Sequence, residues 1–330
     1  MSLALGQARR VRTLVPLSIE DAPPPLGQQV HALSGATMGT SWSLRFVAPR
    51  ELRIEAIERT VAGLLDAVIA EMSHWERDST LSRFNRASAG SWHALPDGFA
   101  EVMAAALEIA RLSSGGFDPT LGAQVRLAGF GPPVDADCRA GAHDWRALRL
   151  REGRLLQPGG VQLDLSAIAK GHAVDRVARV LAAIGIEHQL VEIGGELRGH
   201  GFKPDGTPWW IDVEAPASDA DLPLTRIALH GLAVASSGDY RRYRIEADGR
   251  RVSHTLNPLT QAPIAHGLAA VSVVHASAMW ADGWSTALMS LGLEAGRRLA
   301  DEHGLAALFV QRQGNGFAAF TSAALDALAA

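Results

Sequence analysis

One segment decides the fold: DLSAIAKGHAVDRVARVLAAIGIEHQLVEIGGELRGHG, residues 164–201. Ser166 is the predicted N-cap of a helix, because its hydroxyl can accept a hydrogen bond from a first-turn N–H group. Gly185 stands where a residue in the left-handed conformation ends a helix. Apolar residues recur between them at helical spacing, and Asp175, Arg176 and Arg179 occupy the other face: Ala173, Val174, Val177, Ala178, Leu181 and Ile184.

The same segment continues into a strand and is preceded by a polar loop. Residues 189–193 alternate between apolar and polar positions before Gly194-Gly195 breaks the strand. In the loop, Asp164, Lys170 and Gly171 cluster at the helix entrance, where unpaired N–H groups favour an anion. The helix dipole disfavours a cation there, so a bound phosphate would account for Lys170. On pattern alone, a purely structural helix and strand remains the alternative.

Composition limits the classes of protein that the chain can belong to. The 330 residues are 47% hydrophobic and 20% charged, which is typical of a globular protein with a large core. The net charge of −4 gives no electrostatic signature of nucleic-acid binding. Cys138 is the only cysteine, which excludes intramolecular disulfides and cysteine-based metal clusters. No apolar run reaches the roughly 20 residues of a membrane-spanning helix.

The rest of the chain is predicted to alternate between hairpins and amphipathic helices. We expect an extended arm over residues 1–30, where three consecutive prolines exclude regular structure. Helices are expected at 51–73, 97–113, 277–292 and 293–302. Hairpins are expected at 30–47 with its turn near Ser34-Gly35, at 224–236, around Asp248-Gly249, and at 306–321. Residues 149–156 and 160–165 are expected to form a further pair of strands.

Six blocks, in this order, resemble the ApbE family of FAD:protein FMN transferases. They are MGTSW (38–42), MSHWERDSTLSRFN (72–85), GGFDPTLGAQVRLAGFG (115–131), DLSAIAKGHAVD with VEIGGELRGHG (164–201), SGDY (237–240) and SHTLNPLTQ (253–261). Two positions depart from the family pattern: Ala128 replaces a tryptophan, and Gln261 replaces a glycine. Number and order of the blocks carry the resemblance, because each short motif alone is weak.

The resemblance implies an α+β fold with mainly antiparallel sheets covered by helices. Residues 31–330 would form one domain of two closely packed lobes, with FAD in the cleft between them. The implied reaction transfers FMN from FAD to a threonine hydroxyl of an acceptor flavoprotein and releases AMP. The acceptor would be an electron-transfer subunit, and its identity is not encoded in this chain.

The resemblance also assigns residues to the site. His254, on the predicted return strand of a hairpin, is the candidate base that assists removal of the acceptor proton. Those assigned to FAD are Met38, Trp75, Gly116, Phe117, Asp118, Asp164, Lys170 and Leu256. A lone Trp such as Trp75 usually belongs to a core or its rim, but within its motif the flavin contact is favoured.

A metal site is predicted on the helix at 277–292. Asp282 and Thr286 are four residues apart and therefore share one helix face. Their hard oxygen atoms suit Mg²⁺, although Asp and Thr often share a helix face without binding anything. The resemblance adds the backbone carbonyl of Ala167 as a third ligand.

Two other functions stay open, and so does the location. The first is a pyrophosphatase that splits FAD into FMN and AMP; the second is a non-catalytic FAD-binding or carrier protein. Ser34-Gly35-Ala36-Thr37 matches the core that the family's acceptors carry, and we interpret that match as coincidence. Many family members are exported lipoproteins, but the sequence as written has no signal peptide or lipidation cysteine. We therefore expect a cytoplasmic protein, and the alternative is that the sequence as written lacks a native export leader.

Overall fold

A large antiparallel sheet organises the computed structural model, which describes residues 10–19, 22–133, 141–216, 222–240, 243–249 and 251–329. Its strand order is β18-β17-β16-β11-β8-β7-β3-β2. The bounds are β2 Gln29–Thr37, β3 Thr40–Ala48, β7 Gln189–Ile193, β8 Glu196–His200, β11 Leu232–Gly238, β16 Leu268–His275, β17 Ala306–Gln313 and β18 Gly316–Thr321. All neighbouring strands in this sheet run antiparallel.

The turn between β2 and β3 differs from the prediction. Ser34 and Gly35 lie inside the ladder, where they pair with Ser43 and Trp42. The turn is instead formed by Met38 and Gly39, with φ angles of 48° and 71°. Positive φ at both central positions is typical of the type I′ turn of a two-residue hairpin, and Gly39 adopts it without strain. The longer ladder carries the MGT motif to the tip of the hairpin.

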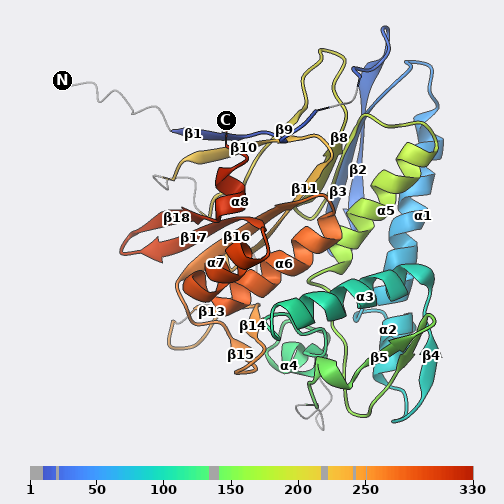
Figure 1. The fold of residues 1–330 in the computed structure, drawn as a ribbon. Helices are drawn as coiled ribbons and strands as arrows, with labels where there is room; N and C mark the ends of the chain where they lie inside the picture. Colours follow the sequence, from blue (N-terminus) through green and yellow to red (C-terminus); the bar gives the residue numbers. More distant parts are fainter. Residues whose placement is uncertain are drawn as a thin grey trace.

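Helices cover one face of the sheet. They are α1 Ile54–Met72, α5 Ala169–Ala183, α6 Ala278–Leu291 and α7 Leu293–Glu302; α3 Asp97–Leu112 packs against α1, α5 and α6. Figure 1 shows α6 and α7 against the sheet, with α1 and α5 side by side at its β2 end. Buried Leu44, Phe46, Val271 and Phe309 of the sheet pack into this layer. The predicted helices at 51–73 and 97–113 are confirmed, because their apolar stripes face this core.

A small second sheet packs on the other face. It has the order β1-β10-β9, with bounds Val11–Leu14, Leu224–Leu229 and Trp209–Asp212. The predicted hairpin of residues 224–236 is wrong, because β10 joins this sheet whereas β11 joins the large one. Gly231, at φ 68°, allows the chain to change sheets between them. β1 lies within the expected arm and pairs with β10; residues 1–9 and 20–21 of that arm lie outside the described residues, as does Cys138.

The remaining elements are short. These are α2 Thr80–Asn85, β4 Trp92–Ala94, α4 Gly122–Leu127, η1 Trp145–Ala147, β5 Arg149–Arg151, β6 Arg154–Leu156, β12 Tyr243–Ile245, β13 Arg251–Ser253, β14 Leu256–Asn257, β15 Ala262–Pro263 and α8 Ala323–Asp326. The predicted strand over 160–165 is wrong: it forms only isolated bridges, Gln162 with Leu121 and Val161 with Ala142. This segment instead carries side-chain bonds that hold the following loop.

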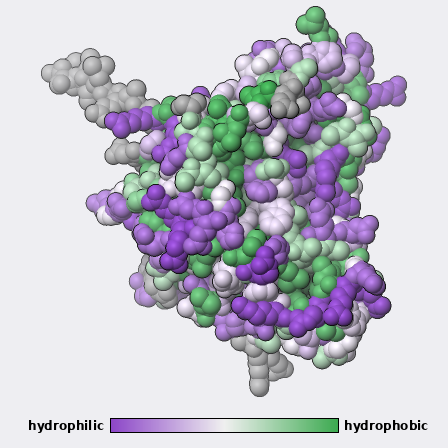
Figure 2. Space-filling model, viewed as in Figure 1, coloured by the Kyte–Doolittle hydropathy of each residue, from purple (hydrophilic) through white to green (hydrophobic). Residues whose placement is uncertain are grey.

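The exterior is mixed in polarity. Figure 2 shows hydrophilic residues spread over the face in view, with apolar residues in separate groups between them. Among the described residues, no helix combines the length and apolar character that crossing a bilayer requires.

Candidate active site

One cleft, of about 1000 Å³, contains every residue that was assigned to the site from the sequence. It opens where the β2–β3 turn, the β7–β8 turn and the start of α5 meet α6 and the segment after β13. The lining includes Met38, Trp75, Gly116, Phe117, Asp118, Asp164, Ala167, Lys170, His254, Leu256, Asp282 and Thr286. The fold thus brings together residues that are up to 248 positions apart in the chain (286 − 38).

The loop before α5 is held by side chains from distant segments. Asn85 bonds both backbone groups of Leu163, donating to its carbonyl at 2.9 Å and accepting from its N–H at 2.7 Å. Asp164 Oδ1 accepts from the Ser166 N–H at 2.8 Å and lies 3.2 Å from His74 Nδ1. Burial alone would raise the pKa of Asp164, but these hydrogen bonds outweigh it and its pKa lies below the usual value.

The helix begins later than predicted. Ser166 lies in the turn of this loop, and α5 starts at Ala169 after Ile168, which provides no side-chain cap. The N-cap prediction for Ser166 is therefore wrong, because Asp164 closes the turn with its carboxylate instead. Of its first N–H groups, that of Ala169 donates to the Leu165 carbonyl and that of Gly171 donates to Asp282. The positive end of the helix dipole still lies at the cleft, which suits an anionic ligand.

Lys170 is paired with a buried carboxylate that the sequence analysis did not select. Its Nζ lies 2.5 Å from Glu196 Oε1, and the Glu196 side chain is only 3% exposed. The other oxygen, Oε2, is buried and makes no hydrogen bond. Burial raises the pKa of Glu196 to about 7, even though Lys170 acts in the opposite direction. Glu196 therefore accounts for a cation at this helix start without any ligand.

Asp282 and Thr286 project from α6 into the same part of the cleft. Asp282 is buried, and its Oδ2 accepts from the Gly171 N–H at 3.0 Å. Burial raises the pKa of Asp282, against the effects of Lys170 and of the Gly171 hydrogen bond. The Thr286 hydroxyl lies 2.9 Å from the hydroxyl of Ser237 on β11. These oxygen atoms face the cleft at the point where α5 and α6 touch.

The donor set suits a hard divalent cation. Among the described residues, no group of three or more His, Cys, Asp or Glu side chains could hold a metal ion. A site here would therefore use one carboxylate, hydroxyl groups and backbone carbonyl oxygens, which is the chemistry that Mg²⁺ accepts. Asp282 also suits a cation because it is buried. Burial raises its pKa, and a nearby positive charge would stabilise the ionised carboxylate.

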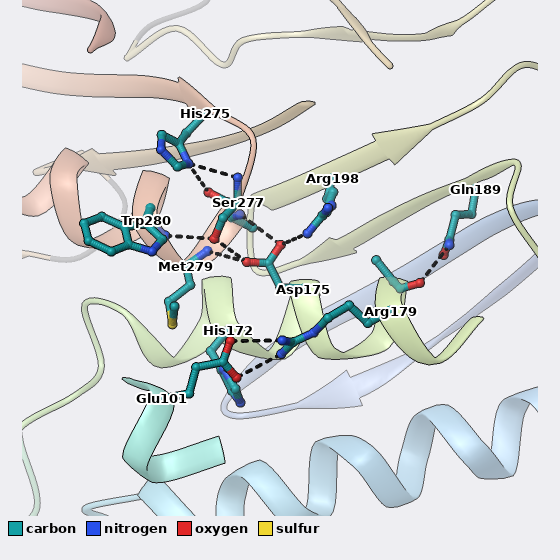
Figure 3. A network of polar contacts seen from close by, with 12 residues as sticks. Glu101, His172, Asp175, Arg179, Gln189, Arg198, His275, Ser277, Met279 and Trp280 are labelled. Atoms are coloured by element: carbon teal, nitrogen blue, oxygen red, sulfur yellow. Dashed lines mark hydrogen bonds and ion pairs between the residues drawn. The ribbon is translucent and has the colours of Figure 1, made fainter. Parts of the chain in front are cut away.

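Asp175 fixes α6 to α5, contrary to its predicted place on the outer face. It is 5% exposed and accepts four hydrogen bonds, which Figure 3 shows meeting at one carboxylate. The donors are Arg198 at 2.5 Å, the Ser277 hydroxyl at 2.6 Å, and the N–H groups of Ala278 and Met279 at 3.0 Å each. The prediction failed because helical spacing does not reveal that the start of α6 lies against this side of α5.

The opposite wall of the cleft comes from the turn after α3. Asp118 Oδ1 accepts from the N–H and hydroxyl of Thr120 at 2.8 and 2.6 Å, and burial raises the pKa of Asp118. The Ser290 hydroxyl donates to the Gly116 carbonyl. A Cβ on Gly116 would lie 2.9 Å from Leu291, so the turn needs a glycine to pack this closely against α6.

Aromatic and imidazole groups form the rim. Trp75 is 55% exposed, and its ring centroid lies 5.6 Å from that of His74. His254 follows the end of β13 rather than lying on that strand, because the ladder ends at Ser253. Its ring meets Phe130 edge-on at a centroid distance of 6.2 Å. A half-buried imidazole therefore lines the cleft next to Phe130.

Comparisons with known proteins agree with this arrangement. A model of the ApbE family matches residues 38–309. The FAD:protein FMN transferase of Vibrio cholerae is 37% identical over 306 residues, covering 89% of this chain and 91% of that protein. That of Klebsiella pneumoniae is 33% identical, covering 88% and 87%. The apo crystal structure of the flavinyl transferase ApbE from Pseudomonas stutzeri superposes with a TM-score of 0.83 at 39% identity, covering 92% of this chain and 98% of that one.

Proposed function

The chain belongs to the ApbE family, and from that premise we propose that it transfers FMN from FAD to a threonine hydroxyl of an acceptor protein and releases AMP. It is a transferase of the α+β fold that the resemblance implied. The convergence of all twelve assigned residues on one cleft carries the proposal. Chance placement would scatter them over the surface, since they come from segments between Met38 and Thr286.

The reaction exchanges one bond to phosphorus for another. The acceptor oxygen attacks the phosphorus atom on the FMN side of the pyrophosphate and forms a phosphoester. The bond from that phosphorus to the bridging oxygen breaks, and AMP leaves with the electron pair. Catalysis of this kind depends on positioning and on neutralising charge. Lys170, which is paired with Glu196, and the start of α5 line the wall where the phosphates would lie, and the dipole of α5 favours an anion there.

Asp282, Thr286 and the Ala167 carbonyl would hold Mg²⁺. When bound, the ion supplies Lewis-acid stabilisation of charge on the pyrophosphate oxygens. The Gly171 N–H keeps Asp282 Oδ2 oriented, and Ser237 places a second hydroxyl beside Thr286. Lys170 lies beside this site and pairs with Glu196 at 2.5 Å.

His254 is the proposed acceptor of the hydroxyl proton. An imidazole nitrogen titrates near neutral pH, so it can take a proton from the attacking oxygen. His254 faces the cleft next to Leu256, which we assign to FAD. The flavin and its ribityl-phosphate would be held by Met38, Trp75, Gly116, Phe117, Asp118, Asp164, Lys170 and Leu256.

The decisive experiment measures AMP release from FAD with Mg²⁺, with and without an acceptor domain, together with the mass of the acceptor. AMP together with an FMN-sized mass gain on the acceptor is the expected result. AMP and free FMN in equal amounts regardless of acceptor would identify a pyrophosphatase instead. Bound FAD with no AMP under either condition would identify a carrier protein. Asp282→Asn is the matched variant, and we expect it to lose Mg²⁺-dependent AMP release.

A further inference from the structure

Strand β11 extends beyond its neighbour β8. The two strands pair only through Leu232, Ala233 and Val234, whereas β11 continues along β16 as far as Gly238. Within the described parts of the chain, no strand covers 235–238 on the side where β8 ends. This stretch, here called the open edge, lines the cleft through Ser236, Ser237 and Gly238.

The direction of the backbone groups at the open edge follows from one hydrogen bond. The Asp239 N–H donates to the Ala269 carbonyl at 3.0 Å, so residue 239 directs its backbone groups toward β16. In an antiparallel pair this direction alternates from residue to residue. Ala235 and Ser237 therefore bond β16, whereas Ser236 and Gly238 direct N–H and C=O groups toward the open edge.

The open edge lies next to the reacting groups. Ser237, between the two outward-directed residues, is 2.9 Å from the Thr286 hydroxyl on the helix side of the sheet. The Gly194-Gly195 turn and Glu196 line the same cleft. Residues 211–214, at and just after the end of β9, also line the cleft but belong to none of the groups assigned to FAD. The cleft therefore has room and lining that the nucleotide assignment does not use.

We propose that an extended segment of the acceptor protein adds to the open edge of β11 as a short strand, alongside residues 235–238, where β8 does not pair with β11. This inference rests on the proposed transferase function. Strand addition suits a polypeptide, because only a second backbone offers alternating donors and acceptors at strand spacing. The contact involves four backbone groups of Ser236 and Gly238, so it sets the register of the acceptor rather than holding it tightly.

Strand geometry also selects which acceptor residue is modified. Side chains of an added strand point alternately to the two faces of the sheet. Only those on the face of Ser237 reach Thr286 and the proposed metal site. Those on the other face meet Val234, which packs in the core beneath the small sheet. A hydroxyl one position away in the acceptor segment would therefore point away from FAD and stay unmodified.

Amide hydrogen exchange tests the proposal in the full-length protein. The probe is the acceptor domain that gains FMN mass in the transfer assay, with its modified threonine replaced by valine. We expect exchange at Ser236 and Gly238 to slow by roughly tenfold or more when this domain is added, and Ala235 and Ser237 to be slow already. Unchanged exchange at both residues would overturn the proposal. Equal slowing by FAD alone would overturn it as well, because the edge would then belong to the nucleotide.

A pair of variants at one position gives an independent test. Ser236→Pro removes the N–H directed at the open edge but keeps the bonds that Ala235 and Ser237 make to β16. We expect kcat/KM for the acceptor to fall roughly tenfold, with the Kd for FAD unchanged. Ser236→Ala removes only the hydroxyl bonded to Ser272, at 2.7 Å, and keeps the N–H group, so it measures how much of the loss comes from the side chain. A loss as large as that of Ser236→Pro would assign the effect to the hydroxyl and contradict the proposal. Unimpaired transfer by a folded Ser236→Pro protein would contradict the proposal.

The two hypotheses fail in different ways. Absence of any FMN gain on any acceptor would reject the transferase function itself. Efficient transfer without protection of Ser236 and Gly238 would reject only the docking site. If Ser236→Pro does not fold, amide hydrogen exchange at Ser236 and Gly238 in the unmodified protein still tests the docking site.

Discussion

Replacement of Asp175 by asparagine should weaken the joint between α5 and α6. Asp175 accepts four hydrogen bonds, and the side chain of its partner Arg198 is only 26% exposed. Asparagine keeps one oxygen but turns an NH₂ group toward donors, and it leaves the guanidinium without its counter-charge. Removing one partner of a buried pair typically costs about 3–5 kcal/mol. We expect about 3 kcal/mol here, since one acceptor oxygen remains and Arg198 is partly solvated.

The size of the thermal shift follows from the length of the chain. With about 2.1 cal/mol/K of unfolding entropy per residue, the 330 residues give about 0.7 kcal/mol/K. A loss of about 3 kcal/mol therefore lowers the melting temperature by about 4 °C. Differential scanning calorimetry of Asp175→Asn measures this shift, and titration with Mg²⁺ measures whether the proposed site at Asp282 is weakened.

A second variant on the same helix serves as control. Arg179 pairs with Glu101 through two contacts of 3.0 Å, but the side chains are 52% and 40% exposed. Exposed pairs contribute about 0–1 kcal/mol, so Arg179→Gln should melt within about 1 °C of the unmodified protein. If Asp175→Asn melts as high as Arg179→Gln and binds Mg²⁺ normally, Asp175 does not fix α6 in the way we infer.

Three further predictions concern the site and its support. His254→Ala should bind FAD normally but transfer FMN slowly, which single-turnover kinetics measures; an unchanged rate would exclude its role as base. Burial lowers the pKa of His172 from 6.5 to about 4. Between these two pH values the folded state binds fewer protons than the unfolded state, so the free energy of unfolding falls by up to about 3 kcal/mol as the pH falls from 6.5 to about 4. Urea unfolding of His172→Gln should show a flatter dependence there, and parallel curves would contradict this. Gly171→Ala places a Cβ 2.2 Å from the Ala278 carbonyl, so it should destabilise the fold by about 3 kcal/mol and weaken Mg²⁺ binding at Asp282; normal melting and Mg²⁺ affinity would refute the close contact.

Helices and strands were predictable from the sequence where each of them buries a single apolar face against a single core. The stripe of residues 51–73 and the alternation at 189–193 each identify an element whose burial is local. Pairing was less predictable, because apolar alternation does not say which sheet a strand joins. The strands at 224–229 and 232–238 are adjacent in sequence and both apolar, yet they belong to different sheets. Only the packing of the two cores separates them.

In the site, too, local patterns were predictable and long-range contacts were not. Motif resemblance selected residues that line the cleft, but it missed those that hold the lining in place. Asp175 was assigned to a solvated face because charged residues at helical spacing usually lie there. Glu196 was overlooked as part of a glycine turn, because an acid next to Gly194-Gly195 gives no local sign that the fold buries it beside Lys170. Asn85, at the end of its motif, fixes Leu163 from 78 positions away, which no local pattern reveals.

The contacts between α5 and α6 explain how the site stays assembled. Gly171 and Asp175 are one turn apart on α5, and they bond Asp282 and the first residues of α6 respectively. Two contacts along α5 fix both the distance between the two helices and the rotation of α6 about its axis. Lys170 precedes Gly171 directly, so one joint positions both the lysine that we assign to the phosphates and the carboxylate of Asp282 that we assign to Mg²⁺. A change that moves α6 therefore disturbs both groups together, even when the large sheet is unaffected.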